Sequence, residues 1–359
     1  MWFTDLSFAP LIPAQSFTDI KSAMEYANNI TVIPNVTTFE HLIINTDATI
    51  GQDHHKITTY GFENLCKILG IPKPFARMIP NDLLFENIRR LRQDNLGTEI
   101  AILSRENGEI ASIVKAPYKE PSYGDLLGLL AARKDVRYID LGEQYLTAGI
   151  AFEDMKLKAE YEEDELFVAS FIQSSIVKES PLRSVSGFIK SKDSVNFIYP
   201  AMGTSRANYK EEDTTLLLAK FGDGIRCYNF QTVEAIGKGL NAFGKYRFSE
   251  AELVGVWRNL SNILYKSLAD EIIGFTEEER KIVVKNVTKL KKENRDAALA
   301  GGVLKDSINS LFDAFDTLFK ISSHATEKTH ESVRFRIEKL AGNWFSNLIL
   351  SHTSHDKIN

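Results

Sequence analysis

Residues 145–177 carry the pattern that decides the fold, YLTAGIAFEDMKLKAEYEEDELFVASFIQSSIV. Much of this stretch alternates between apolar and polar side chains, as a β-strand does when one face is buried. The alternation starts near Val136 and continues to about Phe230. It predicts strands at 145–152, 155–161, 166–177, 185–189 and 195–199. We therefore expect a twisted antiparallel sheet with long connections in the middle of the chain.

Helical patterns precede this sheet. Between Thr59 and Leu69, apolar side chains recur at the spacing of one helix face: Phe62, Leu65, Cys66 and Leu69. Thr58 or Thr59 can cap this helix, and Gly70 ends it. A second helix is expected to begin at a capping Asn81, after a proline-punctuated connection, and a third at a capping Ser122.

A β-hairpin is expected between the second and third of these helices. Its strands are Glu99–Ser104 and Glu109–Lys115, and the turn between them contains Asn107 and Gly108. An Asn-Gly pair tolerates the positive φ angles that a tight reversal needs.

The two ends of the chain differ from its middle. Residues 1–55 are interpreted as an N-terminal arm, in which Ser16 caps a short helix ending at Ala27. Beyond Ser249 the apolar residues recur with the spacing of a helix face. This pattern predicts four amphipathic helices, at 250–273, 276–300, 303–322 and 329–350. The expected fold class is α+β. A helix-and-antiparallel-sheet domain over 56–247 follows the arm of 1–55, and a helical bundle over 248–359 ends the chain.

Composition excludes several classes of protein. The formal net charge is −5, so nucleic-acid binding would need a local basic patch. Two cysteines are too few for a disulfide framework, and no spacing of His, Cys or carboxylates indicates a metal site. No apolar run reaches the ~18 residues of a membrane span, and no signal peptide is evident. We expect a cytoplasmic protein without cofactor, metal or membrane partner.

Four segments together resemble a known family. They are Phe62–Phe75 (FENLCKILGIPKPF), Pro80–Ile88 (PNDLLFENI), Ile110–Tyr118 (IASIVKAPY) and Tyr123–Leu127 (YGDLL). The chain from about 56 to 133 is similar to the phage/plasmid-like family of unknown function numbered 932. This resemblance implies a gene carried by a phage, plasmid or other mobile element, often beside recombination or replication genes. It implies no catalytic residue, because the matching positions are helix-core and turn residues.

Two stretches combine cations with few carboxylates. In 73–92, five cations stand against two carboxylates, and in 181–210 five stand against one. The second stretch also contains aromatic residues, including Tyr199. Cations that neutralise phosphates, interleaved with rings that stack on bases, are typical of single-strand binding. The candidate nucleic-acid-binding residues are Arg183, Lys190, Lys192, Tyr199, Arg206, Lys210, Lys73, Arg77, Arg89 and Arg92. A solvated strand face with inward-pointing aromatics is the alternative interpretation.

Three functions remain open on this evidence. The leading hypothesis is a non-enzymatic, mobile-element-encoded DNA-transaction protein that binds single-stranded DNA, for example in recombination. The second is an interaction module that forms homo-oligomers through its C-terminal helices or binds a host protein, for example to counter a defence system. An enzyme acting on nucleotides or nucleic acid ranks third, because no catalytic motif is recognised and a triad assembled from distant residues leaves no local signal.

Overall fold

The computed structural model describes residues 3–157, 165–190, 196–209 and 213–243, together with 338, 339, 342, 343 and 346. The helices of its N-terminal half are η1 (Phe3–Asp5), α1 (Ile20–Ala27), η2 (Asn28–Ile30), α2 (Thr59–Ile68), α3 (Lys73–Met78), α4 (Asn81–Gln93) and α5 (Tyr123–Ala131). Two more follow the strands, α6 (Thr214–Asp223) and α7 (Phe230–Phe243).

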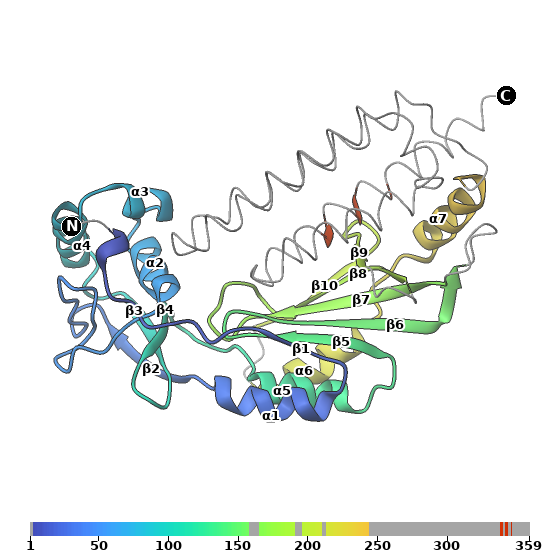
Figure 1. Cartoon of the computed structure of the whole chain (residues 1–359), viewed down its shortest axis with the longest axis horizontal. Coiled ribbons are helices and arrows are strands. Elements are labelled where there is room, and N and C mark those ends of the chain that lie inside the picture. The colour runs from blue at the N-terminus through green and yellow to red at the C-terminus, as the bar shows by residue number, and fades with distance from the viewer. Residues whose placement is uncertain are drawn as a thin grey trace, which may run out of the picture.

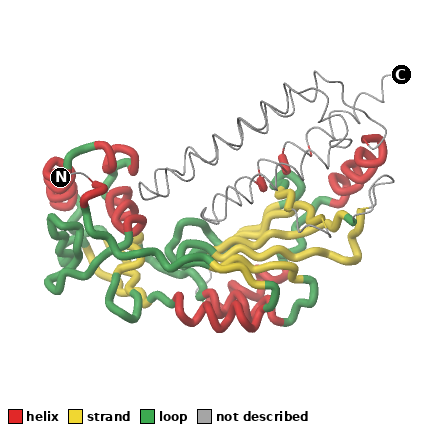
Figure 2. Tube along the Cα trace, viewed as in Figure 1, coloured by secondary structure: helices red, strands yellow, loops and turns green. Residues whose placement is uncertain are grey.

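A seven-stranded antiparallel sheet forms the centre of the described structure (Figure 1). Its strands are β1 (Gln15–Phe17), β5 (Val136–Leu141), β6 (Leu146–Leu157), β7 (Leu166–Ser174), β8 (Arg183–Lys190), β9 (Asn196–Ile198) and β10 (Thr204–Arg206). The order is β1-β5-β6-β7-β8-β10, and β9 also pairs with β8. Helices α1, α5 and α6 lie together along one face (Figures 1 and 2). The α+β class expected from the sequence is confirmed.

A smaller sheet lies at one end of the first (Figure 1). It has three antiparallel strands in the order β2-β3-β4, formed by β2 (Ile33–Thr38), β3 (Glu99–Ser104) and β4 (Ile110–Lys115). Helices α2, α3 and α4 lie beside it, and α2 packs on β4. Their core is centred on the fully buried Phe62, whose ring contacts Phe3, Phe8 and Phe85.

The segment expected to be an N-terminal arm, residues 1–55, supplies an edge strand to each sheet. Strand β1 pairs with β5, and β2 pairs with β3. The expected cap at Ser16 is wrong. Ser16 lies in β1 and donates a hydrogen bond to Asp140 Oδ1 at 2.5 Å, while Asp19 caps α1 by accepting from the amide of Ser22.

The local signals near the first helices and the hairpin are confirmed. The side chain of Thr58 accepts from the amide of Gly61 at the start of α2. Ser122 and Asp125 form a reciprocal capping box at the start of α5. Gly108 has φ +81° in the β3–β4 turn, where a side chain would be strained. The Asn81 cap is wrong, because α4 starts after Pro80 and Asn81 is its first residue.

Two further expectations changed. The two strands expected at 145–152 and 155–161 form one strand, β6, as far as the described residues reach, and its pairing register with β7 shifts after Ala151. The helical bundle expected over 248–359 and the boundary near 247 lie outside the described residues, except for the five between 338 and 346. Among the described helices, none combines the length and the hydrophobicity that crossing a bilayer requires.

Candidate functional site

Six polar residues lie in register across the larger sheet, and we call them the polar row. Each is the direct partner of the next on the neighbouring strand: Ser16, Asp140, Thr147, Gln173, Arg183 and Arg206. Direct partners in a sheet point to the same face. The row therefore crosses that face from β1 to β10, with its carboxylate near one end and two guanidinium groups at the other.

The middle of the polar row is buried. Asp140, Thr147 and Gln173 are 3–4% exposed. The hydroxyl of Thr147 has no hydrogen-bond partner among the residues that the structure describes. Burying an unpaired hydroxyl costs free energy, so a buried polar group of this kind marks a place that a ligand or water would stabilise.

Two arginines face each other at the end of the row. Arg183 on β8 donates from Nε to Gln173 Oε1 at 3.0 Å, and Arg206 is its direct partner on β10. Partial burial is the main cause that lowers the pKa of Arg183, and the positive charge of Arg206 lowers it further. Arg206 is exposed and makes no ion pair with any described residue. Two like charges are held together here, an arrangement that a bound anion would relieve.

Five residues connect α2 and α3 to this end of the sheet, and we call them the junction cluster: Glu63, Lys73, Arg77, Tyr145 and Glu179. Glu63 on α2 is 3% exposed and pairs with both Arg77 and Lys73. Burial raises the pKa of its carboxyl, against the lowering effect of the two cations.

Glu179 brings the two basic stretches of the sequence together. It accepts from Lys73 Nζ at 3.3 Å and from the hydroxyl of Tyr145 at 3.5 Å. Tyr145 in turn interacts electrostatically with Arg183. Lys73 of the first stretch is thus linked through Glu179 and Tyr145 to Arg183 of the second. The charges of Lys73 and Arg77 are already balanced by Glu63 and Glu179, so these two cations position the site more than they bind a ligand.

The loop that carries Glu179 is fastened by tyrosines from distant parts of the chain. Tyr60 donates to Val177 O at 2.9 Å, and Tyr118 donates to Ile176 O at 2.6 Å. The hydroxyl of Tyr209 accepts from the Leu182 amide at 2.7 Å. Hydrogen bonds at several points along one connection hold it in a single conformation, including Lys178 at φ +65°. Sequence reasoning missed this loop, because its partners lie 27–117 positions away.

The other candidate residues lie away from the polar row or make structural contacts. Arg89 forms an exposed pair with Glu86 on α4. Arg92 donates to the carbonyls of Phe39 and Glu40, at 2.7 and 3.0 Å, and so fixes the end of α4 to the chain after β2. Tyr199 is 6% exposed and offers no ring face to a base. Lys192 and Lys210 lie outside the described residues, as does the side chain of Lys190.

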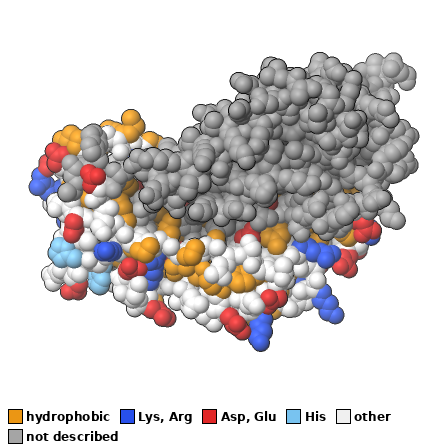
Figure 3. Space-filling view, in the orientation of Figure 1, with side chains coloured by type: hydrophobic (Ala, Val, Ile, Leu, Met, Phe, Trp, Pro, Cys, Tyr) orange, Lys and Arg blue, Asp and Glu red, His pale blue; other side chains and the backbone are white. Residues whose placement is uncertain are grey.

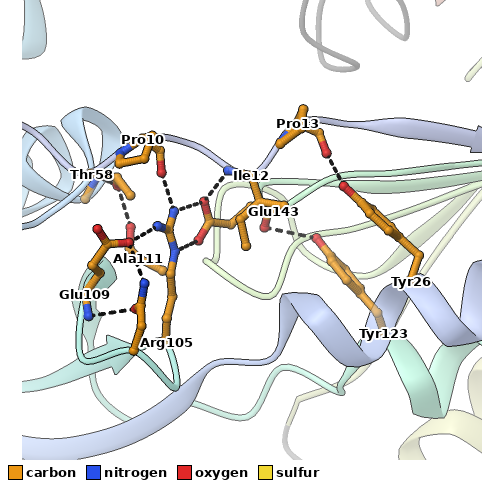
Figure 4. Close-up of polar contacts among 12 residues, drawn as sticks. Pro10, Ile12, Pro13, Tyr26, Thr58, Arg105, Glu109, Ala111, Tyr123 and Glu143 are labelled. Atoms are coloured by element: carbon orange, nitrogen blue, oxygen red, sulfur yellow. Dashed lines mark hydrogen bonds and ion pairs between the residues drawn. The ribbon is translucent and has the colours of Figure 1, made fainter.

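A buried arginine ties the two sheets together away from the polar row (Figure 4). Arg105, at the end of β3, donates from Nε and Nη2 to the two carboxylate oxygens of Glu143 at 2.7 and 2.6 Å. It also donates to Glu109 at 2.6 Å and to Pro10 O at 2.7 Å. Arg105 is 8% exposed and Glu143 is 2% exposed. These contacts join the chain after β3 to the segment before β1 and to the turn between β5 and β6, so the clamp has a structural role.

Comparisons with known proteins give no relative for this chain. No family model matches it, and neither a curated protein nor a solved structure matches it. The function of the candidate site is therefore inferred from its geometry alone.

Proposed function

We propose that the protein binds single-stranded nucleic acid through the phosphates, at the Arg183–Arg206 end of the polar row. The observation that carries the proposal is the pair of opposed guanidinium groups, one half-buried and one exposed. Guanidinium groups match phosphate oxygens with paired hydrogen bonds and remain charged at any physiological pH. A phosphodiester bound between the two would offset their mutual repulsion.

The biological setting of the proposal comes from the sequence. Four segments within 56–133 resemble the phage/plasmid-like family, although no family model matches the chain. On that resemblance we place the protein in a mobile element, beside recombination or replication functions. The proposal assigns the protein a binding role in the cytoplasm and no catalytic step. The pattern of rings in 181–210 does not contribute, because Phe188 and Phe197, like Tyr199, are buried.

Charge reversal at Arg206 tests the phosphate contact. In Arg206→Glu, we expect the affinity for a labelled 20-nucleotide dT oligonucleotide to fall about tenfold at low salt, because an attraction becomes a repulsion. The slope of log affinity against log salt should also become shallower by about one or more. Fluorescence anisotropy at several salt concentrations measures both quantities.

The matched control is Arg89→Glu, which changes the net charge by the same amount at an exposed site on α4. It should change the affinity less than about twofold. Equal losses in the two variants would mean that only overall charge matters. If the wild-type protein fails to bind the oligonucleotide at low salt, the proposed function is wrong.

A second candidate function is self-association, favoured by exposed apolar side chains on α3 and α4. Phe75, Met78 and Leu83 are 47, 75 and 54% exposed. Hydrophobic side chains gather at this end of the molecule in the space-filling view (Figure 3). Neighbouring exposed apolar groups of this size mark protein contact surfaces. The oligomer-forming helices expected from the sequence lie outside the described residues, so this surface is a separate proposal.

Light scattering during size exclusion tests the second candidate. We expect the wild-type protein to elute with twice the mass of one chain and Met78→Asp with the mass of one, because a buried unpaired carboxylate destabilises an apolar contact. Leu216→Asp is the control, since Leu216 is 44% exposed on α6 and Asp suits the first turn of a helix. A single-chain mass for the wild type would exclude this candidate.

A further inference from the structure

Two guanidinium groups project from neighbouring strands at the end of the polar row, and we call Arg183 and Arg206 the arginine pair. They are direct partners across β8 and β10. Side chains at such positions point to the same face of a sheet, and their Cβ atoms lie about 4.5–5.5 Å apart. Arg206 is exposed and Arg183 is half-buried. The two groups therefore start close enough together to contact the same phosphate.

The side chain of Gln173 fixes the orientation of Arg183. Its Oε1 atom accepts from Nε of Arg183 at 3.0 Å and also from Nη2, and it accepts from the hydroxyl of Ser180 at 3.1 Å. Gln173 thus holds the side edge of the guanidinium group, which is formed by Nε and Nη2. The end edge, formed by Nη1 and Nη2, is turned away from Gln173. An edge of this kind pairs with two oxygens of a phosphate.

The acceptor that holds Arg183 is neutral, whereas carboxylates hold the arginine of the clamp. Burial lowers the pKa of Arg105, but the hydrogen bonds and charges of Glu143 and Glu109 outweigh it and raise that pKa overall. The pKa of Arg183 is lowered instead, first by burial and then by the charge of Arg206. The surroundings of Arg183 as a whole therefore do not balance its positive charge, and an anion would.

The cations near the arginine pair do not extend it into a track for the backbone of a strand. Lys73 in the junction cluster pairs with Glu179. Arg137, which lies over the ring of Phe167 on the same face, pairs with Glu153. Binding along several nucleotides requires a groove that stays positive over that length. Among the described residues of this face, the excess positive charge is concentrated at the arginine pair.

The rings of this face do not add recognition of bases. Tyr138, Phe167 and Phe171 are 8, 7 and 0% exposed. A base stacks on a ring only where the face of that ring is open. The affinity of the site must therefore come from the phosphate itself.

We propose that the arginine pair selects the terminal phosphate of a single strand over the phosphates inside it. A terminal phosphate is a monoester with three acceptor oxygens and a charge of about −1.5 to −2 at neutral pH. An internal phosphodiester has one negative charge and two such oxygens. Two guanidinium groups match the charge and the oxygens of the monoester better. This inference rests on the proposed function, because it names which phosphate of the same polymer the same site prefers.

Three matched strands test the preference. Each is a dT 20-mer with the same fluorophore on a central base, and it carries a 5′-phosphate, a 3′-phosphate or hydroxyl groups at both ends. We expect at least one phosphorylated strand to bind about tenfold more tightly than the hydroxyl-ended strand in fluorescence anisotropy. The preference should shrink as the pH falls below about 6, because the monoester loses its second negative charge there while the arginines stay charged.

Two variants locate the preference at the arginine pair. Gln173→Glu places a carboxylate on the side edge of Arg183 and should reduce the preference to less than about twofold, because the added charge neutralises the guanidinium group. Gln93→Glu is the matched control, since it makes the same change at the exposed end of α4, and it should keep the preference. Arg183→Lys retains the positive charge but removes the fork, so it should also lose the preference. Circular dichroism checks that each variant folds, and Arg183→Lys decides the test if Gln173→Glu does not.

Equal affinities of the wild type for the three strands would overturn the inference. A preference that survives both Gln173→Glu and Arg183→Lys would also overturn it. Competition with thymidine monophosphate separates a strand end from a free nucleotide: it should displace the phosphorylated strand less well than the unlabelled phosphorylated strand does, and equal displacement would overturn the assignment to a strand. The proposed function is judged separately on the hydroxyl-ended strand, by its salt-dependent binding and the loss of that binding in Arg206→Glu.

Discussion

Replacing Arg105 by methionine is expected to lower the free energy of unfolding by about 3–5 kcal/mol. The substitution leaves the carboxylate of Glu143 buried at 2% exposure without its cation. The Ile12 amide also donates to Glu143, at 3.3 Å, but it does not compensate a full negative charge. The loss should appear in equilibrium urea unfolding followed by circular dichroism.

Two comparisons separate the buried charge from the loss of side-chain packing. Adding Glu143→Gln to Arg105→Met should recover a substantial part of the loss, because a neutral amide is less costly to bury than an unpaired carboxylate. Arg89→Met removes an exposed cation from its pair with Glu86 and should cost less than about 1 kcal/mol. Equal effects of Arg105→Met and Arg89→Met would show that the clamp contributes little.

Replacing Phe62 by alanine is expected to cost about 3–5 kcal/mol, because the cavity would open where four aromatic rings meet. Phe62 has no exposed surface, and its ring centroid lies 5.8–5.9 Å from those of Phe3, Phe8 and Phe85. Thermal and urea unfolding measure the loss. Phe62→Leu, which preserves more of the volume, should lose less.

Phe230→Ala is the control for the aromatic substitution. Phe230 is 63% exposed at the start of α7, so its removal leaves no cavity. We expect a change within about 0.5 kcal/mol. A loss below 1 kcal/mol at Phe62 would mean that the surrounding rings collapse into the space, and the core would then be more plastic than its packing indicates.

The elements that the sequence predicted well are those whose signals are local. The helix capped by Thr58, the turn at Gly108 and the capping box of Ser122 each depend on residues three or fewer positions apart. Helix α3 was missed because Pro72 and Pro74 suggested a connection, although proline is tolerated in the first turn of a helix. Propensity near residue 16 favoured a cap, but pairing with β5 decided its structure.

The candidate site was predictable only in part, for a related reason. Cations at 183 and 206 stand out in a sequence with few neighbouring carboxylates. Asp140, Thr147 and Gln173 occupy ordinary strand positions, and only the register of five strand pairs places them in one row. The neutralisation of the Lys73 charge was equally hard to predict from the sequence, because its partner Glu179 is 106 residues away.

The edge position of β1 also determines when this protein can complete its fold during synthesis. Ser16 and its partner Asp140 are 124 residues apart. At about 5–20 residues per second, a ribosome needs roughly 6–25 s to make the intervening chain. The first strand therefore leaves the ribosome well before its partner does. The segment that carries β1 is made early but can pair only after β5 has been made, and a chaperone has that interval in which to bind it.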